Sequence, residues 1–315
     1  MHTVVPLLAA GAFSFNWIKP LWIVAAGAAA ATAAMYAIYY LLMLFSPKVA
    51  AITRTAAKEA WAQPLFWVEM ALGVVLILLA PFIPYNTFGE DVKMVKDTGV
   101  TLILVLSIVL AVWTASVSVA EEIEGRTALT LLSKPVGRRQ FIFGKFLGVI
   151  APVLSMFIVL GALFLCAVSY KVKHESRESS TPDPTVAECQ REIVQIVPGL
   201  VLAFMETVML ASIAVALSTR LSMLPNLVIC ATIYVLGHLA PLFANAFRES
   251  RLVSFFGQFI AIAVPNLDDF NIQAAVSTGR SVPLLYLGWA AIYCALYSLA
   301  AMVVALLLFE DRDLA

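Results

Sequence analysis

Seven long apolar stretches, almost free of charged residues, are the feature that most constrains this chain. A helix that crosses a bilayer needs about 20 mostly apolar residues. The stretches that meet or approach this length are Leu21–Phe45, Leu65–Pro84, Gly99–Val119, Leu147–Tyr170, Val197–Leu217, Leu227–Phe243 and Pro283–Phe309. Of the 20 basic and 20 acidic residues, only Glu69 and Glu206 lie inside them. The runs are continuous, whereas barrel strands alternate. The sequence therefore predicts an all-α, polytopic helical membrane protein.

Composition supports this class and excludes others. Hydrophobic residues make up 62% of the chain, against roughly 45–50% in soluble domains. A soluble fold of this length has too little polar surface to cover so much apolar area. The formal net charge is zero, so the basic excess typical of nucleic-acid binding is missing.

The cysteines predict neither disulfides nor a metal site. Cys166, Cys230 and Cys294 lie in apolar stretches, where cysteine usually packs as a small hydrophobic residue. Cys189 lies in a polar segment that we interpret as a loop, without an evident partner. The sequence has no CxxC motif and no cluster of histidine and cysteine.

Two apolar stretches need separate interpretation. Leu21–Phe45 lacks a preceding basic region and exceeds the 7–15 residues of a signal-peptide core, so we expect a retained helix. Leu252–Pro265 is too short to span and contains Gly257 and Gln258. It predicts an interfacial or re-entrant helix, or a segment packed on the outer face.

The distribution of basic residues predicts the orientation. Seven crossings place the two termini on opposite sides of the membrane. Basic residues are densest in one alternating set of segments: Ser46–Pro64, Ala120–Phe146, Ser218–Asn226 and the tail Glu310–Ala315. Cytoplasmic loops carry an excess of Lys and Arg. We therefore expect this set of segments and the C-terminus on the cytoplasmic side of a cell membrane, and the N-terminus on the outer side.

An amphipathic helix is predicted directly after the first span. Ser46 and Pro47 are favourable residues at a helix start. Apolar residues follow at helical spacing, with Arg54 and Lys58 on another face. We expect a helix that lies along the membrane surface, whether as a simple linker or with a further role. Trp61 and Trp67 fit an interfacial aromatic belt.

The segment Ala120–Leu147 carries the most specific pattern. It opens with Glu121, Glu122 and Glu124, and Gly125 weakens the helix that precedes it. Thr127 can cap a short helix, which ends at Lys134-Pro135. The pattern predicts a hairpin with an apolar tip at Leu131 and Leu132. Arg138, Arg139 and Lys145 follow, where we expect them to face lipid phosphates. The tip either docks on a soluble partner or folds back onto the bilayer.

These residues also carry a resemblance. Glu122–Gly125 with Thr127, Leu131-Leu132, Pro135, Arg138 and Gly144-Lys145 resembles the pattern of type-2 ATP-binding-cassette (ABC) permeases, with Arg126 as one extra residue. The entry Pro64-Leu65-Phe66-Trp67 and the ending Leu306–Leu314 are similar to the same family, and the variant resembles its branch associated with multicopper-enzyme maturation and sodium or drug export. The resemblance covers residues 46–315 and leaves 1–45 as an N-terminal segment with an extra transmembrane helix.

The resemblance implies a partner set. Such permeases are the membrane half of an exporter, in which two like or unlike permease protomers pair with a cytosolic ABC ATPase dimer. The hairpin at 120–146 would be the ATPase-coupling element, and its cytoplasmic position agrees with the charge density. ATP and Mg would bind the partner, because this chain has no phosphate-binding GxxxxGK[ST] loop. The chain itself would be neither an enzyme nor cofactor-dependent.

Three titratable residues inside the spans are candidates for a substrate path. A charged Glu206 at mid-membrane is unfavourable unless it is paired, hydrated or protonated. It either lines a path or hydrogen-bonds hydroxyls such as those of Thr207 or Ser212. Glu69 lies close enough to Pro64 to reach the cytoplasmic interface. His238 follows Gly237 and either titrates in a path or packs between helices.

Two other function classes remain open at the level of sequence. A secondary transporter or channel could use Glu69, Glu206 and His238, but such folds favour inverted repeats with broken helices, and we find no clear internal repeat. An intramembrane enzyme would need paired catalytic groups at membrane depth, and His238 is the one histidine within a predicted span.

Overall fold

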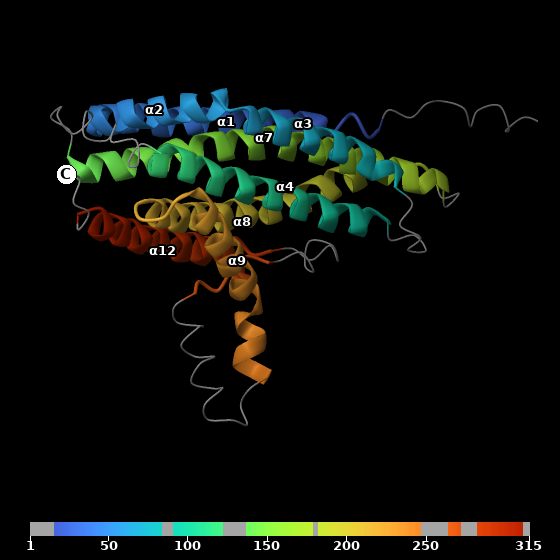
Figure 1. Cartoon of the computed structure of the whole chain (residues 1–315). Helices are drawn as coiled ribbons and strands as arrows, with labels where there is room; N and C mark the ends of the chain where they lie inside the picture. Colours follow the sequence, from blue (N-terminus) through green and yellow to red (C-terminus); the bar gives the residue numbers. More distant parts are fainter. Residues whose placement is uncertain are drawn as a thin grey trace, which may run out of the picture.

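The computed structural model describes residues 16–83, 91–121, 137–178, 182–246, 264–271 and 282–310, and within these ranges every regular element is a helix. The α-helices are α1 (Leu21–Phe45), α2 (Pro47–Ala62), α3 (Pro64–Leu79), α4 (Asp91–Ala115), α7 (Arg138–Glu178), α8 (Val186–Ser218), α9 (Met223–Ala246) and α12 (Leu284–Glu310). Shorter turns of helix are η1 (Ala80–Phe82), η2 (Ser116–Glu121) and η3 (Asp268–Phe270). Figure 1 shows most of them side by side in one elongated bundle.

The predicted class of an all-α, polytopic membrane protein is confirmed. Six helical stretches of the described residues are long and apolar enough to span a membrane, and Met223–Leu239 within α9 is a shorter apolar stretch. The first helix has the predicted bounds, Leu21–Phe45. Several others extend beyond their apolar stretches. At about 1.5 Å per residue, the 41 residues of α7 reach roughly 60 Å, about twice the thickness of the hydrocarbon core.

Polar contacts explain why α4, α7 and α8 continue past their apolar stretches at one end, which we call the far end. Lys171 on α7 forms an ion pair of 3.1 Å with Asp91, the first residue of α4. The buried Lys96 pairs with Glu192 on α8. Glu175 accepts a hydrogen bond of 3.3 Å from the amide of Val92, which satisfies one of the free amides at the start of α4. These groups hold polar helix ends together.

The two described chain ends lie at opposite ends of the bundle (Figure 1). At the far end, Ser169 donates a hydrogen bond of 2.8 Å to the carbonyl of Trp17, and the Trp17 and Tyr170 rings meet edge to face. At the other end, the ring of Phe309 stacks on that of Phe141 with centroids 5.7 Å apart. We call this the hairpin end, because η2 stops and α7 begins there.

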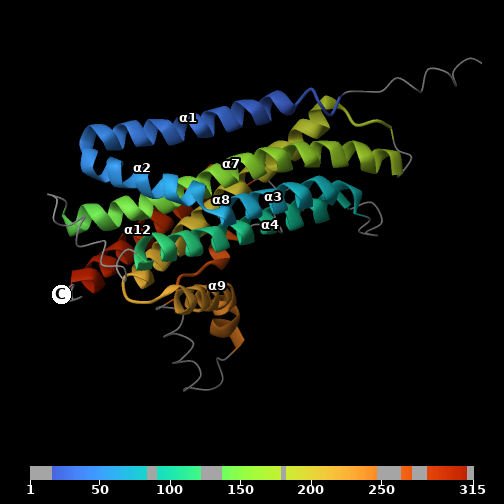
Figure 2. The ribbon, with the colours of Figure 1, turned by 45° about the horizontal axis from the view of Figure 1, so that its top comes forward.

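Helix α2 packs lengthwise along the first half of α7, and this differs from the surface helix predicted above. Figure 2 shows α2 running back from α1 beside α7. Small residues make the approach possible: a Cβ on Gly144 would lie 2.7 Å from Ile52 Cβ, and one on Gly148 only 2.4 Å from Ala56 Cβ. Thr53 adds a hydrogen bond of 3.2 Å to the Gly144 carbonyl. The small-residue face therefore binds a helix instead of lying flat on lipid.

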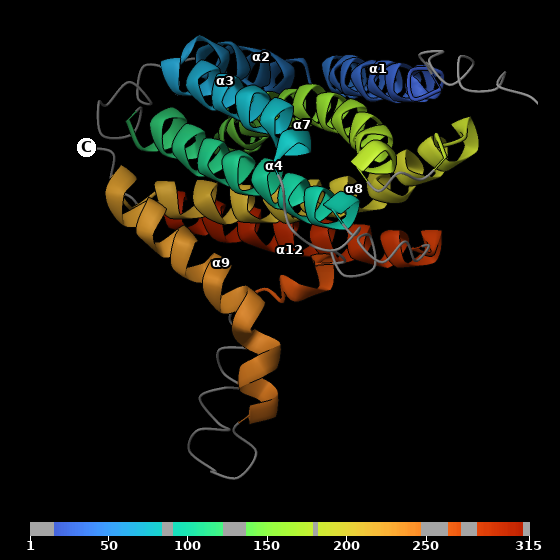
Figure 3. The same cartoon turned by 90° about the vertical axis from the view of Figure 1, so that its right-hand side faces the viewer.

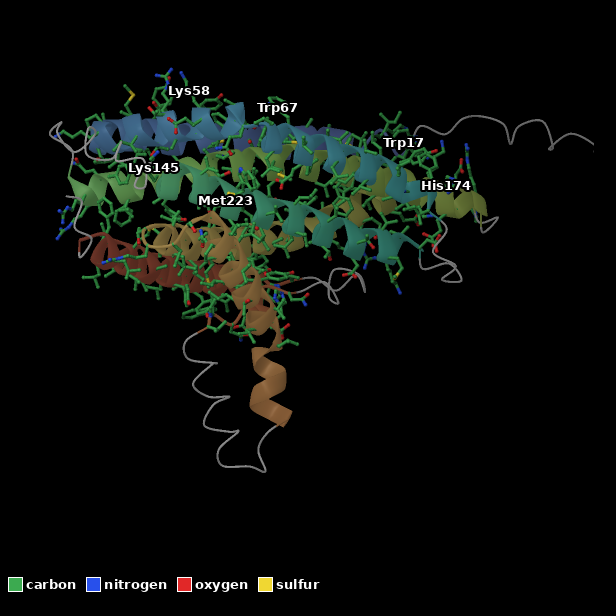
Figure 4. All side chains as sticks on the ribbon, viewed as in Figure 1. Trp17, Lys58, Trp67, Lys145, His174 and Met223 are labelled. Atoms are coloured by element: carbon green, nitrogen blue, oxygen red, sulfur yellow. The ribbon has the colours of Figure 1, made fainter. Side chains whose placement is uncertain are left out.

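Two further expectations are corrected. Lys145 does not face lipid phosphates: its side chain is 3% exposed and lies 3.8 Å from Glu59 of α2, so α2 covers it (Figure 4). Cys189 does not lie in a loop. It is a buried residue in the first turn of α8. This helix starts eleven residues before the predicted apolar stretch, and a capping box of Thr185 and Glu188 stabilises its start.

Helix α9 crosses the other helices steeply, and its C-terminal part leaves the bundle (Figure 3). The described segment 264–271 packs at its side. Leu267 Cγ would lie 2.7 Å from a Cβ on Gly237, and the Leu267 amide donates to the Gly237 carbonyl at 3.3 Å. Gly237 is thus required for close approach. Most of the stretch predicted to be interfacial or re-entrant, residues 252–263, lies outside the described residues.

Candidate functional site

The predicted coupling hairpin lies largely outside the described residues. Residues 122–136 are not described, and they hold the following candidates: Glu122, Glu124, Gly125, Thr127, Leu131, Leu132, Lys134 and Pro135. The two remaining candidates flank this gap. Glu121 is the last residue of η2, and Arg138 is the exposed first residue of α7. The hairpin itself therefore stays a prediction, while both of its flanks are in place.

A π-helix leads into the hairpin. Residues Ser116–Glu121 follow α4 with π-helical hydrogen bonding, a rare conformation that often marks a functional position. Ser116 donates 2.8 Å to the carbonyl of Val112. The change from α-helical to π-helical hydrogen bonding alters the direction of the chain directly before the hairpin.

Asn226 ties this π-helix to two other helices. Its buried amide nitrogen lies 2.8 Å from Ser116 Oγ, 2.8 Å from Ser218 Oγ and 3.1 Å from the carbonyl of Ala214. The amide oxygen accepts from the Cys230 thiol at 3.4 Å. One side chain thus joins the start of η2, the end of α8 and the start of α9 at the hairpin end.

Sequence reasoning missed the role of Asn226. The only available signal was an amide between Pro225 and a long apolar stretch, where an isolated polar residue must either face water or find partners. Its partners are 110 and 8 residues away in sequence, and single-sequence reasoning has no access to such proximities.

A second site lies in the bundle interior, where the structure brings Glu206 and His238 together. Glu206 on α8 is 2% exposed, and its Oε1 lies 3.5 Å from Nε2 of His238 on α9. The other ring nitrogen, Nδ1, lies 3.1 Å from the carbonyl of Tyr234. The Tyr234 ring sits beside the imidazole, with centroids 4.7 Å apart. Two residues that the sequence offered as separate candidates form one pair.

The geometry limits where protons can lie on this pair. A carbonyl oxygen only accepts, so Nδ1 carries a hydrogen. At 3.5 Å, Nε2 and Oε1 of Glu206 lie within ion-pair distance but form no hydrogen bond with each other. With one proton for the two groups, the pair is either a neutral imidazole beside a protonated carboxyl group or an imidazolium beside a carboxylate, and both forms have no net charge. That neutrality reduces the penalty of a lone carboxylate at membrane depth.

The hydroxyl partners proposed for Glu206 from sequence are used elsewhere. Thr207 donates to the carbonyl of Ala203 at 2.9 Å, and Ser212 donates to that of Met209 at 2.6 Å. Both satisfy their hydroxyls on their own helix, as Ser and Thr commonly do. Glu206 Oε1 has no hydrogen-bond partner among the described residues.

A cavity of about 110 Å³ opens beside the Glu206–His238 pair. Helices α4, α8 and α9 and the 264–271 segment form its walls, and Asp97, Thr101 and Phe270 line it. A water molecule needs roughly 10–15 Å³ of such volume, so the cavity holds several waters or one small polar group.

The charges on the wall are unequal. Lys96 and Glu206 both line the cavity, but Lys96 is paired with Glu192 and Glu206 with His238, whereas Asp97 adds a further carboxyl group. Next to the wall, burial raises the pKa of Asp269 above that of an ordinary aspartate, and the neighbouring charge of Asp268 raises it further. A ligand that donates hydrogen bonds or carries positive charge fits this wall best.

Glu69 is separate from this site. It lies on the buried face of α3, 5% exposed, one helical turn before Gly73, which packs against Leu160 of α7. Its Oε2 has no hydrogen-bond partner among the described residues. Glu69 does not line the cavity, and its place in a substrate path stays a prediction.

Comparison with known proteins adds one match. Residues 90–314 match the model of a family described as ABC-2 family transporter protein. The matched range starts just before α4, includes both the hairpin and the Glu206–His238 pair, and leaves α1, α2 and α3 outside. No curated protein matches the chain.

Proposed function

The chain belongs to the ABC-2 transporter family, and on this premise we propose that it is the permease subunit of an exporter that uses ATP hydrolysed by a separate cytosolic ABC ATPase dimer. The sequence has no phosphate-binding loop of its own. ATP and Mg would therefore bind the partner, and this chain would supply the membrane path.

The observation that carries the proposal is the position of the predicted hairpin. It lies between η2 and α7, and Asn226 fixes η2 to α8 and α9 by side-chain hydrogen bonds. A displacement of the hairpin by an ATPase would thus move three helices together. Exposed basic residues at the same end, Arg138, Arg139 and Arg220, support a cytoplasmic hairpin and a cytoplasmic C-terminus.

We assign the substrate path to the cavity beside Glu206 and His238. It is a space between membrane helices that is lined in part by carboxyl groups, and intramembrane carboxylates often mark such paths. Glu206→Gln should keep assembly but change the stimulation of ATP hydrolysis by substrate. Glu69→Gln is the matched control, because it neutralises a buried carboxyl away from the cavity. Normal transport by Glu206→Gln would remove this residue from the path.

The test of the whole proposal is Leu131→Asp with Leu132→Asp. Burying a leucine in an interface contributes about 1.5–3 kcal/mol, and buried unpaired aspartates would oppose docking further. We expect the variant to insert normally and to lose the co-purifying ATPase, or the stimulation of ATP hydrolysis.

The matched control places two aspartates at Arg220 and Ser222, at the same end but outside the hairpin. It should retain the ATPase. If the leucines instead rest on the bilayer, the Leu131→Asp, Leu132→Asp variant should insert poorly at Phe141–Leu147 yet still bind its partner. Inserted protein that keeps both binding and stimulation would show that the hairpin is not the coupling element.

The same purification identifies the second protomer. Two permease chains are expected in the complex, alike or different. A differently tagged copy of this chain that co-purifies shows a homodimer, and an unlike permease chain in its place shows a heterodimer.

A further inference from the structure

A large apolar groove runs between α1, α2, α7 and α8, and we call it the α1 groove. Its volume is about 470 Å³. The floor is formed by apolar residues of α7 and α8, including Ile150, Leu154 and Phe204. It shares no lining residue with the cavity beside Glu206, so it is a second and independent site.

The groove exists because α1 stands at the edge of the bundle. Of the residues of α1, only Val24 is buried, and the helix packs on α2 and α7. Figure 2 shows α1 along the outside of the bundle, antiparallel to α2. Its inner side, with Tyr36 and Tyr39, forms one wall of the groove.

Two cations lie at the rim. Arg54 and Lys58 both line the groove and both are exposed. They are four residues apart on α2, so they share one face of the helix. Neither has an ion-pair partner within the described part of the chain. The nearby Glu59 pairs with Lys145 instead. Figure 4 shows Lys58 at the outer edge of α2.

The depth of these cations follows from the register of α2 on α7. Ile52 packs at Gly144 and Ala56 at Gly148, so by the same offset Arg54 lies level with Phe146 and Lys58 with Ile150, around the first turn of the apolar stretch that begins at Leu147. The start of such a stretch is where we expect the headgroup region to meet the hydrocarbon core. The floor continues past this level to Leu154. The groove therefore has a cationic head and an apolar tail in the order of a phospholipid.

We propose that the α1 groove binds an anionic phospholipid, with the phosphate on Arg54 and Lys58 and one acyl chain along the floor. Basic pockets between transmembrane helices are suited to anionic headgroups. A soluble anion would use the rim but not the floor, and a second copy of this chain would use the floor but would bring no phosphate. The combination of both features favours the lipid.

The test uses the full-length protein in neutral detergent, with phosphatidylglycerol or phosphatidylcholine added. Native mass spectrometry counts bound lipid, and thermal unfolding follows stabilisation. We expect phosphatidylglycerol to bind and to raise Tm, and phosphatidylcholine to have little effect. Arg54→Gln with Lys58→Gln should bind phosphatidylglycerol about 30-fold more weakly, given about 1 kcal/mol per basic residue.

The matched control is Arg139→Gln with Arg220→Gln. It removes the same charge from the same end of the bundle but from residues outside the groove. It should bind phosphatidylglycerol like the unaltered protein. Equal retention by the Arg54→Gln, Lys58→Gln variant would overturn the proposal, as would equal losses in the two double variants.

A second variant tests the acyl chain. Ala151→Trp fills the floor and leaves both cations in place, while Val159→Trp adds the same ring on an exposed part of α7. Loss of phosphatidylglycerol in Ala151→Trp alone supports the proposal. Two outcomes overturn it: full competition by inorganic phosphate, which shows a simple anion site, and conversion of dimers to monomers by Ala151→Trp with lipid retained, which shows a protomer interface.

Discussion

Nε2 of His238 lies 3.5 Å from Oε1 of Glu206, and the two residues come from different helices in the bundle interior. The contact joins α9, which leaves the bundle at its C-terminal end, to α8, one of its central helices. Its contribution to stability can be measured separately from its role in transport.

We expect Glu206→Leu and His238→Leu each to lower Tm, because each leaves the other group, the buried Glu206 or the partly buried His238, without its partner. The double variant should lower Tm by less than the sum of the two. Polar pairs between membrane helices contribute about 0.6–2 kcal/mol, and the coupling should fall in this range. Thermal unfolding in detergent measures it. Strict additivity would mean that the two groups do not interact.

The approach of α2 to α7 predicts a rescue. Gly148→Ala places a Cβ 2.4 Å from that of Ala56, and overpacking typically costs about 1–3 kcal/mol. Gly148→Ala with Ala56→Gly restores the space and should recover most of the loss in Tm. Gly27→Ala is the control: its Cβ would meet nothing within 4 Å, so Tm should stay level or rise. No loss in Gly148→Ala would contradict this packing.

Asn226→Ala should loosen the hairpin end. It leaves Ser218 Oγ and Ser116 Oγ without their buried donor, at about 1–3 kcal/mol. We expect lower Tm and faster amide hydrogen exchange at the start of α9. Thr232→Val is the control on the same helix, because the exposed Thr232 bonds only to the carbonyl of Val228 among the described contacts. If the two variants behave alike, Asn226 is not an anchor.

The pair Lys96–Glu192 should respond unequally to loss of either partner. Lys96 is 2% exposed and Glu192 is 30% exposed. Glu192→Gln leaves an almost buried ammonium unpaired, which we expect to cost about 3–5 kcal/mol. Lys96→Met leaves a carboxylate that water can reach, so its effect on Tm should be clearly smaller. Arg191→Gln, an exposed neighbour, should change stability by less than about 0.5 kcal/mol. The reverse order would show that Lys96 has another anionic partner.

Topology can be tested by labelling in intact cells. The four native cysteines are free and are first replaced by alanine. Cysteine at the exposed Pro182, at the far end, should react with an impermeant maleimide. Cysteine at the exposed Gly137 should react only after permeabilisation. Reaction of Gly137→Cys from outside would reverse the orientation.

Hydropathy predicted the positions of the apolar helices well, and the N-terminal helix to the residue, although six helices rather than seven are long and apolar enough to span a membrane among the described residues. It failed where a helix continues in polar sequence, as α7 does through Lys171 and Glu175. Those turns are stabilised by partners on α4, and no local pattern reveals such partners. The same limit applies to the site. Burial made Glu206 and His238 candidates one at a time, but their pairing depends on how α9 crosses α8.

The lengthwise packing of α2 on α7 sets an order of events during synthesis. The hydroxyl of Thr53 bonds to a carbonyl that lies 91 residues later in the chain. At about 5–20 residues per second, the ribosome makes that partner about 5–18 seconds after Thr53. Throughout this interval α1 and α2 are in the membrane without their main support. The N-terminal helices are therefore made first but complete their packing only after α7 has been made.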